Sequence, residues 1–157
     1  AAAPAHFERL LEQLMDAQFG PLDAATRAFL GNHLRWVELP AGATLMRQGE
    51  SGDAGYLLVS GRLRAYISED GAPPRLVREM SRGEVIGELS MYTGDARSAT
   101  VVAVRDCMLV RLDREHFEAL LATSASTSIV FTRQIIRRLQ TQHQRRPLAA
   151  PVTVGLM

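Results

Sequence analysis

The stretch GELSMYTGDARSAT, from Gly87 to Thr100, decides how the rest of the chain is interpreted. It has an acid at its start, Glu88, and an arginine near its end, Arg97, and small residues surround both. Residues 88–92 fit one or two turns of helix, whose first N–H groups have no partner within the helix and so suit an anion. Gly87 lets another group approach the backbone closely. The stretch therefore predicts an anion site.

The residue types in this stretch narrow the anion to the phosphate of a nucleotide. A guanidinium from Arg97, a hydroxyl from Ser98 and helix N–H groups together suit a phosphate, and Ala99 leaves room for one. Glu88 would repel a phosphate, so its expected role is to accept a hydrogen bond from a sugar hydroxyl. There is no phosphate loop of the ATPase type and no acidic pair for magnesium, which disfavours ATP chemistry. A Glu88–Arg97 salt bridge without function is the structural alternative.

The apolar periodicity around this stretch predicts an α+β fold. Helical spacing covers residues 4–19 and a second helix to about residue 32, with Asp23 as its N-cap. The period then changes to two, with Gly and Pro clusters between short runs. The predicted strands are 36–39, 44–47, 56–60, 62–68, 76–80, 85–86, 99–104 and 107–113. We expect an antiparallel β-roll or jelly-roll barrel of about eight strands, flanked by N-terminal and C-terminal helices.

The same patterns predict how the chain is divided. Residues 1–34 form an N-terminal helical segment, and 35–113 form the β-roll with the cassette 87–100. Residues 114–146 form C-terminal lid helices, and 147–157 form a tail or the start of a following domain.

Gly87-Glu-Leu and Arg97-Ser-Ala-Thr, nine residues apart from Glu88 to Arg97, resemble the phosphate-binding cassette of the cyclic nucleotide-binding domain family. Residues 40–53 and 56–61 are similar to the glycine-marked hairpins of that family. The resemblance implies a β-roll that holds cAMP or cGMP between the cassette and a mobile C-terminal helix. Arg97 would pair with the phosphate, Glu88 would accept from the ribose 2′-hydroxyl, and Ser98 would donate to the phosphate. Gly87, Leu89, Ser90 and Ala99 would complete the ligand site through backbone contacts or space.

The resemblance also implies a lid and a base preference. Ile135, Ile136 and Leu139 are the candidates for capping the base, with ordinary packing on the β-roll as the alternative for each. A hydroxyl at Ser98 is compatible with either base, and cAMP is favoured over cGMP.

Composition excludes several other functions. A chain of 157 residues with 46% apolar residues folds, and a net charge of +1 does not suit general binding to nucleic acid. There is no nucleophile elbow or catalytic triad pattern, so we expect no catalytic residues. The one cysteine, Cys107, and the scattered histidines predict neither a metal site nor a cofactor beyond the nucleotide ligand. Without a signal peptide or an apolar span, the expected location is cytoplasmic.

The C-terminal helix predicts the partners. Arg133, Arg137, Arg138, Arg145 and Arg146 make it basic, which suits an acidic partner or a membrane surface better than nucleic acid. This helix and the Pro-Val-Thr-Val tail resemble the linker after the nucleotide domain in patatin-like phospholipases of the neuropathy target esterase type. An effector domain in a longer parent chain is therefore expected, with a channel, transporter or transcription factor as other parents. The rival interpretation is an interaction module that keeps the β-roll but binds no nucleotide.

Overall fold

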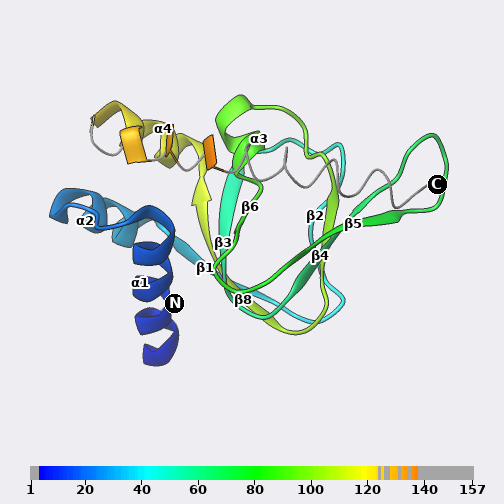
Figure 1. Cartoon of the computed structure of the whole chain (residues 1–157), viewed down its shortest axis with the longest axis horizontal. Helices are drawn as coiled ribbons and strands as arrows, with labels where there is room; N and C mark the ends of the chain where they lie inside the picture. The colour runs from blue at the N-terminus through cyan, green and yellow to red at the C-terminus, as the bar shows by residue number, and fades with distance from the viewer. Residues whose placement is uncertain (1–3, 124, 126–127, 131, 134–135, 138–157) are drawn as a thin grey trace.

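The computed structural model describes residues 4–123, 125, 128–130, 132–133 and 136–137. Two helices come first, eight strands and one short helix follow, and a further helix comes after the last strand (Figure 1). The elements are α1 Ala5–Phe19, α2 Ala24–His33, β1 Arg35–Leu39, β2 Thr44–Met46, β3 Ala54–Ser60, β4 Leu63–Ile67, β5 Arg75–Met80, β6 Val85–Ile86, α3 Glu88–Thr93, β7 Thr100–Ala103, β8 Cys107–Asp113 and α4 Arg114–Thr123. The ends of each predicted strand lie within two residues of the ends of an observed strand.

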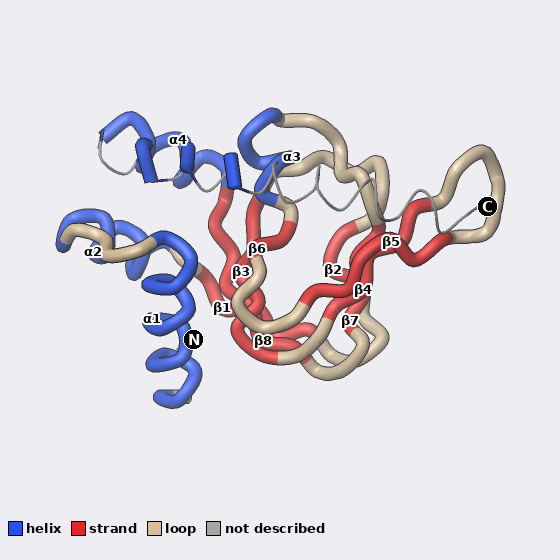
Figure 2. The backbone as a smooth tube through the Cα atoms, in the orientation of Figure 1, coloured by secondary structure: helices blue, strands red, loops and turns tan. Residues whose placement is uncertain are grey.

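The eight strands form two four-stranded sheets, and every strand pair is antiparallel. The strand order is β1-β8-β3-β6 in one sheet, called sheet A here, and β2-β7-β4-β5 in the other, called sheet B. Figure 2 shows the strands curling around a shared interior. Buried side chains of both sheets fill it, among them Leu58, Leu63 and Leu109 at 0% exposure. The predicted α+β roll is confirmed.

Local chemistry places the turns and caps where the sequence predicts them. Asp23 caps α2, since its carboxylate accepts from the Thr26 N–H at 2.7 Å. The hairpin between β4 and β5 turns at Asp70 and Gly71, which have φ values of 48° and 77°. Both Asp and Gly tolerate this left-handed region, which suits the tight turn of a hairpin.

The helices cover the outer face of sheet A. Leu57, Val59, Val85 and Val110 point outward from that sheet and meet one face of α1. Trp36 also lies in this layer, and its Nε1 donates to Glu8 Oε1 at 3.2 Å. A neighbouring cluster joins α2, α3 and α4 around Leu30, Met91 and Phe117. Cys107 is buried in the roll interior, and burial raises the pKa of its thiol.

Beyond α4, the described residues 125, 128–130, 132–133 and 136–137 are helical. Ile135, Leu139, Arg138, Arg145, Arg146 and the tail 147–157 lie outside the described residues. Among the described residues, no helix is both long enough and apolar enough to span a bilayer.

Candidate ligand site

The site begins with the short helix α3, which a glycine precedes and a glycine follows. Gly87 has a φ of 76° and Gly94 a φ of 78°, so both adopt the left-handed conformation that glycine accepts without strain. A Cβ on Gly87 would collide with Arg97 Nη1 and lie 3.1 Å from Met46 Cε. The absence of a side chain at residue 87 therefore lets the guanidinium lie directly against the start of α3.

Arg97 is held inside the protein by main-chain groups. Its side chain is 5% exposed, Nη1 donates to the Gly87 carbonyl at 3.0 Å, and Nη2 donates to the Ala54 carbonyl at 2.8 Å. Its own backbone N–H donates to the Glu50 carbonyl at 2.7 Å, and its carbonyl accepts from the Gly49 N–H at 2.9 Å. Burial lowers the pKa of the guanidinium, but an arginine stays protonated at neutral pH.

Glu88, the first residue of α3, is buried to 3% exposure. Burial raises the pKa of its carboxyl to about 7. The positive charge of Arg78, hydrogen bonds from the N–H groups of Glu88 and Leu89, and the charge of Arg97 act in the opposite direction and only partly offset burial. At neutral pH this carboxyl is divided between its two protonation states.

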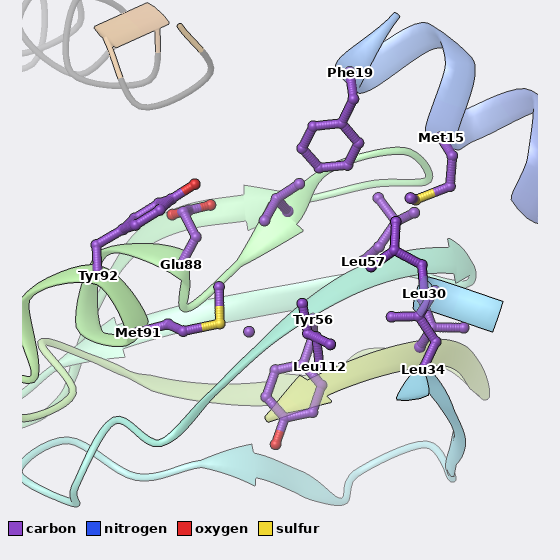
Figure 3. A pocket seen from close by; sticks show the side chains of 13 residues that line it. Met15, Phe19, Leu30, Leu34, Tyr56, Leu57, Glu88, Met91, Tyr92 and Leu112 are labelled. Atoms are coloured by element: carbon purple, nitrogen blue, oxygen red, sulfur yellow. The ribbon is translucent and has the colours of Figure 1, made fainter. Parts of the chain in front are cut away.

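A small apolar cavity lies on the helical side of Glu88. It has a volume of about 60 Å³, and residues of α1, α2, sheet A and α3 line it (Figure 3). Its lining includes Met15, Phe19, Leu57, Met91 and Glu88. This cavity is too small for a nucleotide and nearly free of polar surface, so it is a packing gap beside the candidate site.

The remaining predicted ligand residues surround the buried pair unevenly. Leu89 and Ala99 are partly buried, and Ser98 is exposed. Ser90 is buried, with its hydroxyl 3.5 Å from the Ala96 carbonyl. Of the three lid candidates, Ile136 alone is described, and it is 49% exposed.

The segment that holds Arg97 was not predicted as part of the site. Residues 40–53 resemble a glycine-marked hairpin, which indicates no contact with Arg97, yet Gly49 and Glu50 form hydrogen bonds with the Arg97 backbone and the Ala54 carbonyl accepts from its side chain. Gly52 packs so closely on Ser90 that a Cβ there would collide with the serine side chain. The paired glycines of this loop were the available signal, because close backbone contact is a common reason for glycine.

One group of metal-ligating side chains occurs in the part of the chain that the structure describes. Single ligand atoms of Asp113, Glu115 and His116 lie within 4.8 Å of one another. Asp113 accepts from Arg111 Nε at 2.8 Å and from Arg35 Nη2 at 3.1 Å. Two guanidinium groups thus occupy the carboxylate, and the group is better described as a surface ion-pair network than as a metal centre.

Comparisons with known proteins agree with this geometry. The family model described as "Cyclic nucleotide-binding domain" matches residues 36–124. Patatin-like phospholipase domain-containing protein 7 of Rattus norvegicus is 36% identical over 114 residues, which cover 69% of this chain but only 8% of the relative.

Two solved structures show the same fold. A cyclic nucleotide-binding domain from Methylobacillus flagellatus is 22% identical, has a TM-score of 0.77 and covers 90% of this chain and 80% of its own. The regulatory domain of Toxoplasma gondii PKA, crystallised with cAMP, is 27% identical and has a TM-score of 0.67. The match covers 85% of this chain and 49% of the Toxoplasma chain. Since the family model spans more than half of the sequence and includes the whole cassette, the chain belongs to the cyclic nucleotide-binding domain family.

Proposed function

We propose that this chain is a regulatory module that binds a cyclic purine nucleotide, with the phosphate on Arg97 and the ribose 2′-hydroxyl on Glu88. The observation that carries the proposal is the burial of two opposite charges, at 3% and 5% exposure, in one short cassette. Burying charged groups costs free energy, and the raised pKa of Glu88 indicates that this cost is not fully offset. A ligand that brings an anion and a hydroxyl donor to this pair would reduce the cost.

The donor capacity of Arg97 supports the phosphate role. A guanidinium has five N–H groups, and two of them donate to neutral carbonyls of Gly87 and Ala54. A phosphate oxygen is charged and makes hydrogen bonds about twice as strong as those of a neutral acceptor. A phosphate would therefore compete well for the remaining donors.

Signalling from the site would pass through α3 to α4. Tyr92 of α3 meets Phe117 of α4 edge to face, with ring centroids 4.8 Å apart. Arg114 of α4 lies against Gly94, because a Cβ at that glycine would be 2.6 Å from Arg114 Nη1. A ligand that shifts α3 would thus act directly on α4. Ile135, Ile136 and Leu139 would then cover the bound base, and this closure requires that the ligand bind the closed state better than the open one.

The regulated effector would lie elsewhere in a longer chain. The rat relative is named a patatin-like phospholipase, and the matched region is a small part of it. We infer a similar arrangement for the parent of this chain, with a catalytic domain that the nucleotide controls. Arg133 and Arg137, both exposed on the C-terminal helix, would suit contact with an acidic partner or membrane surface.

The Toxoplasma gondii domain, which was crystallised with cAMP, supports including the cAMP preference that the sequence favours. Ser98, the residue on which the sequence-based preference turns, is exposed and compatible with either base. Both nucleotides therefore belong in the test.

A module that binds no nucleotide is the second candidate function. The observation that favours it is the pair of bonds from Arg97 to Gly87 and Ala54, because these bonds give the arginine a structural role without ligand.

Isothermal titration with cAMP and cGMP separates the two functions. We expect the wild type to bind at least one of them, and Arg97→Ala to bind at least about tenfold more weakly, because a charge-assisted hydrogen bond contributes about 1.5–3 kcal/mol. Arg97→Lys should also bind more weakly, since an ammonium lacks the guanidinium fork. Arg75→Ala, on the exposed tip of the β4–β5 hairpin, is the matched control. Absence of binding heat for both nucleotides in the wild type would support the interaction module instead.

A further inference from the structure

The loop between β2 and β3 holds the cassette through consecutive main-chain groups. The N–H of Gln48 donates to Thr100 Oγ1 at 3.0 Å. The N–H of Gly49 donates to the Arg97 carbonyl at 2.9 Å, and the Glu50 carbonyl accepts from the Arg97 N–H at 2.7 Å. The position of this loop therefore decides where the main chain of Arg97 lies.

The side chain of Gln48 ties the same loop to the hairpin between β4 and β5. Its Nε2 donates to the Ser68 carbonyl at 3.1 Å, and its Oε1 accepts from the Ser68 N–H at 2.8 Å. A carboxamide that donates to one residue and also accepts from it fixes the direction of the contact as well as its distance. Ser68 is in turn fixed within the hairpin, where its hydroxyl donates to the Ala72 carbonyl at 2.9 Å. Gln48 thus connects the hairpin to the cassette.

The loop depends on such a tie because solvent surrounds it. Gln48, Gly49 and Glu50 are all exposed, and exposed loops open locally at a low cost in free energy. Arg97 itself is buried, and its Nη1 and Nη2 each donate to a main-chain carbonyl. A hydrogen bond weakens steeply as its angle departs from linear. A shift of the Arg97 main chain would therefore misalign its guanidinium against a phosphate.

We propose that Gln48 is a positioning residue for nucleotide binding: it ties the β2–β3 loop to the hairpin and so holds Arg97 in the orientation that receives the phosphate. The inference rests on the proposed function, which assigns the phosphate to Arg97. Both ends of the Gln48 carboxamide already pair with Ser68, so Gln48 acts on the ligand through Arg97 and not by contact.

A double-mutant cycle tests this role, with affinities for cAMP and cGMP measured by isothermal titration. Gln48→Ala should weaken binding about three- to tenfold, which is the range expected from the loss of one or two exposed hydrogen bonds. The same change in an Arg97→Ala background should weaken binding less than about twofold, because the side chain that Gln48 positions is gone.

Two further variants sharpen the cycle. Thr100→Val keeps the shape of the side chain and removes the oxygen that accepts from the Gln48 N–H, so it should give a smaller loss that also depends on Arg97. Gln13→Ala, on the exposed side of α1, is the matched control and should leave the affinity unchanged. If Arg97→Ala binds too weakly to titrate, Arg97→Lys replaces it as the background, since lysine keeps the charge without the fork.

The possible results separate this inference from the proposed function. A Gln48→Ala variant that binds as tightly as the wild type, or that loses the same factor with and without Arg97, overturns the positioning role while nucleotide binding stands. A wild type that binds neither nucleotide overturns both. If Gln48→Ala does not fold, Thr100→Val decides by the same comparison, and a loss that is equal in the two backgrounds overturns the role.

Discussion

Replacing Glu88 with glutamine should stabilise the ligand-free protein at alkaline pH, although it removes a proposed ligand residue. The carboxyl has a pKa of about 7 in the fold, against an ordinary value of 4.5 in the unfolded chain. Below pH 4.5 both states bind the proton and Glu88 costs nothing by ionisation. As pH rises through this window the unfolded state releases its proton first, so stability falls with pH until it levels off above pH 7.

The size of the effect follows from the two pKa values. At about 1.4 kcal/mol per pH unit, the difference between 4.5 and about 7 corresponds to about 3 kcal/mol at pH 8. Glutamine stays neutral at every pH and avoids this cost. Urea unfolding of wild type and Glu88→Gln at pH 4.5, 6, 7 and 8 should therefore give free energies that agree at the acid end and separate by up to about 3 kcal/mol at the alkaline end.

Glu84→Gln is a matched control with the opposite expected sign. Burial raises the pKa of Glu84, but hydrogen bonds from Ser81 and the charge and hydrogen bond of Arg78 outweigh burial and lower it overall. A group with a lowered pKa stabilises the fold at neutral pH and loses that contribution as pH falls, so Glu84→Gln should destabilise at pH 8. If the Glu88→Gln and wild-type free energies stay parallel from pH 4.5 to 8, the carboxyl does not titrate near 7 and the reasoning about its burial is wrong.

Three further predictions concern the same cassette. Nucleotide affinity should fall by up to about tenfold per pH unit below 7, because the ribose hydroxyl donates best to ionised Glu88; a flat titration profile from pH 8 to 5.5 would contradict this. Gly87→Ala should destabilise the fold by more than about 1 kcal/mol, since the new methyl group meets Arg97 and residue 87 has a φ of 76°; an unchanged melting temperature would exclude this clash. Phe117→Ala should cost about 3–5 kcal/mol from a site at 1% exposure, measured by urea unfolding, and a loss below 1 kcal/mol would mean that α4 packs loosely.

Sequence periodicity predicted most of the fold because local signals agree with the tertiary structure here. Alternating apolar residues in 107–113 and the turn at 69–71 carry their own geometry, and Asp23 marks a helix start. The ends of strands were less accurate. β3 begins at Ala54, two residues before the predicted start, because Ala54 and Gly55 pair with Asp113 and Leu112 of β8, and a pairing partner so distant in sequence leaves no local signal.

The cassette could be predicted from a linear motif, but its surroundings could not. Glu88 and Arg97 lie close together in the sequence, so their spacing carries information. Arg97 donates to the main-chain carbonyl of Ala54, and because any residue type has such a carbonyl, the sequence carries no signal for this contact. The inward position of Arg78 could have been predicted, since it occupies the same face of a predicted strand as Met80, and an arginine on an inward face is unusual.

α3 contacts the β-roll with one face and the helical cluster with the other. Glu88 and Ser90 are buried beside the roll, while Met91 and Tyr92 pack against the cluster that contains Phe117. Gly87 and Gly94, both in the left-handed conformation, separate the six residues of α3 from the segments on either side. The apolar cavity next to α3 provides space on its helical side. Because packed interiors resist partial displacement, we expect a ligand that moves α3 toward that space to move α4 as well.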